Sequence, residues 1–232
     1  AVGVGGADAV EVMAGLPWEV LYPRRIGVHL VGEMSGWTAP KDVILYLAGE
    51  LTVSGGTNAI IEYFGPGART ISCTGKATIT NMGAELGATT SIFPHDERMD
   101  RYLEATGQGE LAKLAGEHHD MLVADDEIES RPEEHFDRIV EIDLSRLEPH
   151  VVGPHSPDRA RPISEMASEV ADEANGFIDE ISSALIGSCT NSSYEDMSRV
   201  ADLADQAQAK GVHAATPLMV TPGSEQVRAT IE

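Results

Sequence analysis

The chain has 232 residues and carries 38 acidic side chains against 16 lysines and arginines, for a formal net charge of −22. This charge argues against DNA and anionic membranes as partners, because phosphate groups are bound by clustered basic side chains. No run of about 18 apolar residues is present, so we expect no membrane-spanning helix. The chain starts without methionine and stops within an apparent helix, and we expect an internal piece of a longer polypeptide.

Lysine is scarce and is found only at Lys41, Lys76, Lys113 and Lys210. An acidic surface poor in lysine is typical of halophilic proteins, because salt screens the repulsion between like charges. An ordinary acidic cytosolic protein fits the same composition, and both interpretations stay open. The chain has two cysteines, Cys73 and Cys189, which indicates a reducing compartment rather than a disulfide framework.

Short apolar runs of strand character alternate with stretches of helical periodicity. In chain order the pattern predicts a helix at 5–15, a strand at 24–33, a helix at 40–48 with Thr38 as its N-cap, a strand at 59–64, a helix at 74–87, a strand at 90–93, helices at 95–105 and 108–119, a strand at 136–144, a helix at 164–174, a strand at 181–187, a helix at 193–210, a strand at 216–221 and a helix from Ser224 onward. This alternation predicts an α/β fold.

Two segments show no clean period. Residues 120–134 are strongly acidic, and we predict a surface loop there. Residues 149–162 hold four prolines, and we predict an extended crossing segment and a domain boundary.

Cys189 is placed just before a predicted helix and just after a predicted strand, within GSCTNSSYEDM at 187–197. Ligands of α/β sheets bind at the carboxyl ends of strands, and a helix N-terminus favours a thiolate or another anion. Spacing alone equally fits a small buried cysteine followed by a plain cap from Ser192 or Ser193. One cysteine cannot hold an iron–sulfur cluster, which needs three or four thiolates.

Asn81 and Glu85 lie four residues apart in the predicted helix at 74–87, so we expect them to share one face. A carboxylate beside an amide in a crowded site could act as a base or contact a substrate. A solvated helix face with Cys73 in the core fits the same pattern.

Five blocks of this sequence resemble the aconitase family, in the family's order and across nearly the whole chain. Two of them carry the most specific motifs, GSCTNSSYEDM and SCTGKATITNMGAELGATTSIFP. The blocks lie at residues 3–19, 35–49, 72–94, 187–197 and 221–232. The residues of these motifs are similar to those of the mitochondrial-type branch of the family.

The resemblance implies a hydro-lyase that interconverts citrate and isocitrate through cis-aconitate, with a [4Fe–4S] cluster held by three cysteines. It implies that Cys189 is one of these ligands and that the other two lie outside this chain. It further implies that Glu85 is an active-site acid, that Asn81 lies near the cluster and that Asn191 is a nearby polar residue. Cys73 matches no functional position of the family. We therefore expect the chain alone neither to hold a cluster nor to turn over citrate.

In the family, three α/β domains of αβα layers surround the cluster and a fourth closes over it. The resemblance assigns residues 1–23 to the end of the first domain, 24–148 to the second and 149–232 to the first part of the third. Domain edges cut in this way expose apolar surface, so we expect self-association. The resemblance also implies a location in the mitochondrial matrix or in a prokaryotic cytoplasm.

Two alternatives stay open within this resemblance. One is the large subunit of isopropylmalate or homoaconitate dehydratase, which shares the GSCTN motif. The other is an RNA-binding relative that has lost its cluster, and the charge of −22 argues against it.

Overall fold

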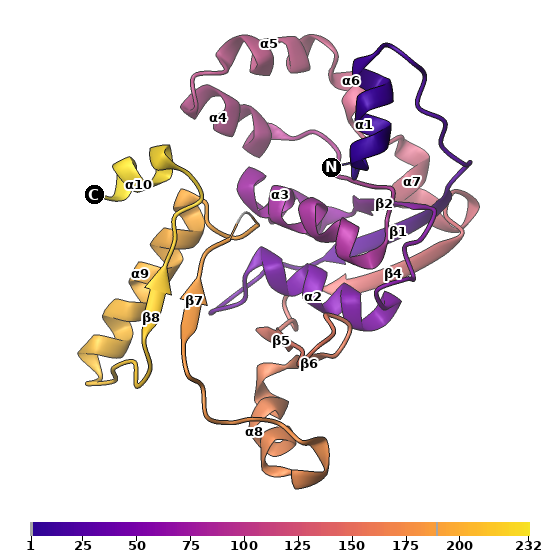
Figure 1. Cartoon of the computed structure of the whole chain (residues 1–232). Coiled ribbons are helices and arrows are strands. Elements are labelled where there is room, and N and C mark those ends of the chain that lie inside the picture. Colours follow the sequence, from indigo (N-terminus) through magenta and orange to yellow (C-terminus); the bar gives the residue numbers. More distant parts are fainter. Residues whose placement is uncertain (1, 189) are drawn as a thin grey trace. The chain divides into compact units, whose positions relative to one another are not determined.

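The computed structural model describes residues 2–188 and 190–232. They form two compact units, one that ends at Ser164 and one that runs from Glu165 to Glu232. The first unit is built on a four-stranded sheet, and the second contains the strand pair formed by β7 and β8 (Figure 1).

The four strands of the first unit are parallel and lie in the order β3-β2-β1-β4. They are β1 (Arg24–Val31), β2 (Ala59–Phe64), β3 (Thr90–Ile92) and β4 (Arg138–Asp143). Ile26 of β1 is paired with Ile61 on one side and with Arg138 on the other. Parallel neighbours need crossover connections, which helices supply here, so the predicted α/β fold is confirmed.

The crossovers explain the strand order. Helix α2 (Pro40–Leu51) connects β1 to β2, and α3 (Cys73–Asn81) connects β2 to β3, with 3-10 turns η1 (Pro66–Thr70) and η2 (Met82–Leu86) on either side. The chain then forms α4 (Glu97–Ala105), α5 (Gly109–Glu117), α6 (His119–Leu122) and α7 (Asp126–Ser130). Because β4 lies beside β1, this last connection returns across the sheet to its far edge.

One face of the sheet holds the larger core. Ile26, Val28 and Leu30 alternate along β1 and are almost fully buried, together with Ile44 and Leu47 of α2. The period of two in the strand and the helical spacing in α2 bring these side chains into one cluster. Each such side chain contributes about 1.5–3 kcal/mol through burial.

The other face is covered by a smaller cluster of Phe64, Ile128 and Phe136. Gly27 of β1 leaves room for the Phe136 ring, since a Cβ at this glycine would lie 2.5 Å from it. His29 stacks on Phe64 with a ring-centroid distance of 4.9 Å. Both faces of the sheet are therefore covered, as parallel sheets require.

The start of α2 differs from the prediction. Its N-cap is Ala39 rather than Thr38, and the Asp42 carboxylate accepts the Ala39 amide at 2.7 Å. Thr38 instead donates its hydroxyl to the Leu147 carbonyl at 2.9 Å. Thr38 does not cap the helix because its hydroxyl makes this tertiary contact, which a sequence pattern does not reveal.

The predicted surface loop at 120–134 is wrong in part. It contains α7 and the 3-10 turn η3 (Pro132–Glu134), and Ile128 is buried within it. Arg131 bridges the two short elements through ion pairs to Glu127 and Glu134, each at 2.9 Å. The acidic residues form the outer surface of a segment that one apolar anchor holds against the sheet.

The predicted extended crossing at 149–162 contains a strand pair. β5 (His150–Val152) and β6 (Ala160–Pro162) are antiparallel, and Val151 is paired with Arg161. The His150 amide donates to the Asp42 carboxylate at 2.8 Å, which fixes this pair to the start of α2. The four prolines of this segment, one of them within β6, gave it no strand pattern in the sequence.

The predicted helix at the start of the chain is present as α1 (Gly6–Met13), and it is mostly exposed. Helix α8 (Ile163–Ala171) leads into the second unit, where a 3-10 turn η4 (Glu173–Asn175) follows. The later elements are β7 (Ala184–Ile186), α9 (Tyr194–Ala209), β8 (Leu218–Val220) and α10 (Glu225–Ile231), as predicted in order and type. Among the described residues, no helix is long and apolar enough to cross a membrane.

Candidate active-site segments

The segment predicted to carry a cluster ligand follows β7. The strand ends at Ile186, and Gly187 and Ser188 then have φ angles of 145° and 85°. A positive φ at a residue other than glycine is strained, so the surrounding contacts must hold Ser188 in place. Cys189 lies outside the described residues. Gly187 and Ser188 follow the carboxyl end of a strand that is paired in parallel, as predicted for this part of the segment.

A reciprocal cap ends this loop. The Ser193 hydroxyl accepts the Asp196 amide at 3.2 Å, and the Asp196 carboxylate accepts the Ser193 amide at 3.0 Å. This capping box fixes where α9 begins. Asn191 is half-buried two residues before the cap.

Asn81 and Glu85 lie in the first unit, in a different local structure from the predicted one. The α-helix ends at Asn81, and Glu85 belongs to the 3-10 turn η2. Because 3-10 residues advance by about 120° rather than 100°, the two side chains do not share one face as in an α-helix. Both residues are exposed.

Asn81 lines a small cavity of about 90 Å³ at the amino end of β3, with Gly83, Ala84 and Thr90 among its other walls. Gly83 keeps this region close-packed, because a Cβ there would overlap the Ser91 side chain. Glu85 is not among the lining residues. It follows the lining residue Ala84 in the η2 turn, so its backbone lies next to the cavity. Asn191 belongs to the second unit.

The residues of this chain do not supply a complete ligand set for a [4Fe–4S] cluster. The sequence has two cysteines, whereas a cluster needs three or four thiolates. Cys73 is half-buried in the first turn of α3, and burial raises the pKa of its thiol, which disfavours the thiolate. Across residues 2–188 and 190–232, no group of three His, Cys, Asp or Glu side chains is placed to hold a metal ion.

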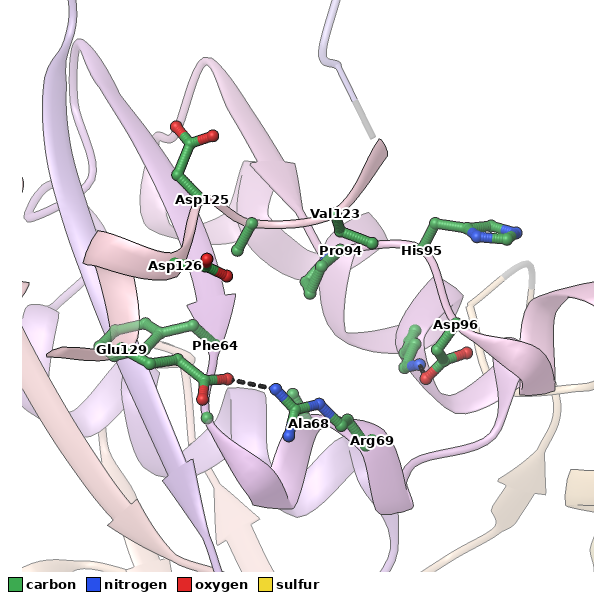
Figure 2. Close-up of a pocket in the computed structure, with 13 residues that line it drawn as sticks. Phe64, Ala68, Arg69, Pro94, His95, Asp96, Val123, Asp125, Asp126 and Glu129 are labelled. Atoms are coloured by element: carbon green, nitrogen blue, oxygen red, sulfur yellow. Dashed lines mark hydrogen bonds and ion pairs between the residues drawn. The ribbon is translucent and has the colours of Figure 1, made fainter. Parts of the chain in front are cut away.

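A larger cavity of about 180 Å³ lies at the opposite end of the strands, at the carboxyl ends of β2 and β3 (Figure 2). Its walls come from Phe64, from η1, from the turn after β3 and from residues 123–129. Figure 2 shows Arg69 reaching Glu129 across one side, at 2.5 Å. The sequence-predicted residues Asn81 and Glu85 are not part of it, and a second ion pair, between Lys76 and Asp96, also lines it.

Glu62 lines an adjacent cavity of about 310 Å³. Burial raises the pKa of the Glu62 carboxyl, and the nearby Asp125 carboxylate raises it further. Both causes disfavour the charged form in the folded chain.

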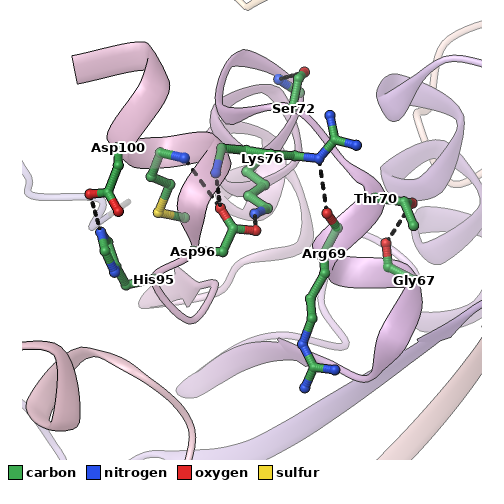
Figure 3. Close-up of polar contacts among 11 residues, drawn as sticks. Gly67, Arg69, Thr70, Ser72, Lys76, His95, Asp96 and Asp100 are labelled. Atoms are coloured by element: carbon green, nitrogen blue, oxygen red, sulfur yellow. Dashed lines mark hydrogen bonds and ion pairs between the residues drawn. The ribbon is translucent and has the colours of Figure 1, made fainter. Parts of the chain in front are cut away.

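A buried ion pair joins α3 to α4 (Figure 3). The Lys76 ammonium group, with a side chain 4% exposed, pairs with the Asp96 carboxylate, which also caps α4 by accepting the amides of Arg98 and Met99. Next to it, His95 Nε2 lies 2.9 Å from Asp100. Sequence reasoning missed this cluster, although a lysine inside the tightly packed helix α3 was the available signal. Because Asn81 ends α3, the pair also fixes the helix that presents it.

Comparisons with known proteins bear on these segments directly. A sequence model of the aconitase family (aconitate hydratase) matches residues 1–232. The chain therefore belongs to the aconitase family. It is 57% identical over 232 residues to the mitochondrial aconitate hydratase of Emericella nidulans, 56% over 231 residues to that of Schizosaccharomyces pombe and 57% over 233 residues to that of Saccharomyces cerevisiae.

These matches include all of this chain but only a part of each relative. The chain spans 29% of the Emericella nidulans protein, 28% of the Schizosaccharomyces pombe protein and 29% of the Saccharomyces cerevisiae protein. The family membership thus rests on the whole chain, which is less than a third of each relative's length.

Proposed function

We propose that this chain is a segment of an aconitate hydratase, in which Cys189 is one of three cluster ligands, Glu85 is the catalytic acid, and Asn81 and Asn191 belong to the vicinity of the cluster and substrate. The observation that carries the proposal is the family match over residues 1–232, together with the placement of the GSCTN loop after a parallel strand. When bound, the cluster supplies a Lewis acid for a substrate hydroxyl and carboxylate.

The chain's own residues have separate tasks in this proposal. The exposed Glu85 carboxylate takes or returns a proton of the substrate, as a positioned acid or base does. The Asn81 amide can donate and accept hydrogen bonds at the cavity it lines, and Asn191 offers the same chemistry beside the cysteine loop. Citrate, cis-aconitate and isocitrate are the proposed substrates.

We assign residues 1–23 to the end of a first domain, 24–148 to a second and 149–232 to the start of a third. The compact unit extends beyond residue 148, because the β5–β6 pair packs on α2 and His150 bonds to Asp42. Limited proteolysis tests how far this compact unit extends: the first cuts are expected in the exposed segment 172–182 that follows α8, and first cuts near residue 148 would place its end there instead.

The relatives are named as mitochondrial enzymes, and we propose the mitochondrial matrix or a prokaryotic cytoplasm for this protein. We also propose that the isolated chain associates with itself. Met13, Tyr22 and Ile178 are 86–87% exposed, and large apolar side chains in contact with water favour association. Light scattering tests this, and a monomer at all concentrations contradicts it.

A chimera tests the catalytic proposal. This chain replaces the aligned segment of the Saccharomyces cerevisiae relative, and the product is reconstituted anaerobically with iron and sulfide. We expect hydration of cis-aconitate, with at least about a tenfold preference over isopropylmalate and homoaconitate. A preference for either competing substrate would establish the corresponding dehydratase instead. The isolated chain, treated in the same way, is expected to bind no stoichiometric iron.

A further inference from the structure

We propose that the segment from Thr221 to Gly223, which follows β8, positions the loop that contains Cys189. The inference rests on the proposed function, in which this cysteine holds a cluster iron. It assigns Thr221 and Gly223 as positioning residues: they act through the backbone of the loop and do not touch the cluster or the substrate.

The first contact lies at the start of the loop. The Thr221 amide donates to the Ile186 carbonyl at 2.8 Å, which extends the pairing of β7 with β8 by one residue. The Thr221 side chain then lies directly over Gly187, where an added Cβ would overlap its hydroxyl. Gly187 has a φ of 145°, a conformation that only glycine adopts readily. Thr221 therefore packs on the residue where the loop leaves the strand.

The second contact lies at the end of the loop. The Gly223 amide donates to the Ser192 carbonyl at 2.9 Å. A Cβ at Gly223 would lie 2.6 Å from the Ser192 hydroxyl and 2.9 Å from its carbonyl oxygen, so glycine permits this approach. Ser192 is 3% exposed, and its hydroxyl donates back to the Ser188 carbonyl. The described residues on either side of Cys189 are thus joined to each other through Ser188 and Ser192, and one neighbouring segment contacts both sides.

The 221–223 segment is itself held in place. Ser224 caps α10, and its hydroxyl accepts the Val227 amide at 3.1 Å. The strands alone offer little support, because β7 and β8 have three residues each, and Leu185 and Met219 are 61% and 64% exposed. We therefore infer that the residues on either side of Cys189 depend on the contacts of the 221–223 segment for their placement. A metal ligand needs such support, since small displacements weaken coordination.

The test uses Gly223→Ala in the full 232-residue chain, with Gly116→Ala as the control. Gly116 lies in α5 with open space around the added Cβ. We expect amide hydrogen exchange in peptides covering 186–193 to accelerate at least about tenfold in Gly223→Ala and to stay unchanged in the control. Peptides from the sheet strands are expected to keep their protection, which separates loop release from unfolding. Unchanged exchange at 186–193 would overturn the inference.

The second measurement places Gly223→Ala in the chimera with the Saccharomyces cerevisiae relative. The expected result is a fall in bound iron to below about half of the unsubstituted chimera, with a matching loss of the cluster's visible absorption. Thr221→Val is expected to act in the same direction, because it removes the hydroxyl that donates to the Ile186 carbonyl at 3.5 Å, and Thr221→Ser should bind iron normally, since serine keeps this hydroxyl. Full iron binding by Gly223→Ala would contradict the inference. A chimera that binds no iron before any substitution would refute the proposed function. In that case, hydrogen exchange in the 232-residue chain would still test whether the 221–223 segment holds residues 186–193 in place.

Discussion

The Lys76 ammonium group and the Asp96 carboxylate form a buried ion pair between α3 and α4, and the same carboxylate caps α4. The Asp96 carboxylate therefore accepts hydrogen bonds from three donors, namely the Lys76 ammonium group and two backbone amides. Lys76 has this one ion partner in the described contacts. Removing Asp96 should therefore cost more stability than removing Lys76.

Asp96→Ala is expected to destabilise the chain by about 3–5 kcal/mol, because it leaves the Lys76 charge buried without a partner. Lys76→Met should cost less, since methionine fills the volume and the carboxylate keeps its two backbone amides. Urea unfolding measures both. Arg101→Met is the control, because its ion pair with Glu97 is exposed and contributes less than about 1 kcal/mol. Equal losses for Asp96→Ala and Lys76→Met would contradict the unequal roles.

Glu62→Gln is expected to stabilise the chain at neutral pH. Burial and Asp125 raise the pKa of Glu62 above its ordinary value of 4.5, so the folded chain holds this proton more tightly than the unfolded chain. Stability therefore falls as the pH rises through this range, and glutamine removes that loss. The urea midpoints of the two proteins should converge as the pH falls below 4.5. Glu104→Gln, on an exposed helix face, should show no such pattern, and a constant difference at all pH values would contradict the account.

We expect Gly27→Ala to lower the free energy of unfolding and its matched control, Gly116→Ala, to raise it. A Cβ at Gly27 meets the Phe136 ring at 2.5 Å in the centre of the sheet, and we expect a loss of about 1–3 kcal/mol from overpacking. A Cβ at Gly116 meets no atom within 4 Å, and alanine in this helix should add about 0.5–1 kcal/mol. Thermal unfolding measures both. A neutral effect of Gly27→Ala would mean that the second face of the sheet is loosely packed.

The sequence predicted the regular elements well where the periodicity was long. The alternation in β1 and the helical spacing in α9 identified both elements to within a few residues. It failed where a distant contact decided the local structure. Thr38 resembles a cap but bonds to Leu147, and the His150 strand was unrecognised because its anchor is Asp42, more than a hundred positions away.

The site residues came from resemblance rather than from spacing. Asn81 and Glu85 were expected on one helix face, whereas the helix tightens to a 3-10 turn between them. The lysine within α3 was a signal for the cluster around Lys76, but its partner Asp96 could not be predicted, because a strand separates the two residues and they become neighbours only when α3 and α4 pack. Cys189 lies outside the described residues, so its role stays a prediction.

Glu85→Gln tests the proposed acid. In the chimera with the Saccharomyces cerevisiae relative, we expect kcat for cis-aconitate to fall at least about a hundredfold, because glutamine cannot transfer the proton. Iron content and the urea midpoint should stay unchanged, since Glu85 is exposed and has no part in the core. Glu117→Gln, at the exposed end of α5, is the control. Activity within about twofold of the unsubstituted chimera would remove Glu85 from the catalytic assignment.

The most direct test of the account compares the chain's two cysteines in the same chimera. After anaerobic reconstitution, Cys189→Ser and Cys73→Ser are assayed for bound iron and sulfide and for the visible absorption of the cluster. The account predicts that Cys189→Ser loses the cluster and that Cys73→Ser retains it, because only the first is a proposed ligand. Retention of the full cluster by Cys189→Ser, or its loss in Cys73→Ser alone, would contradict the central claim.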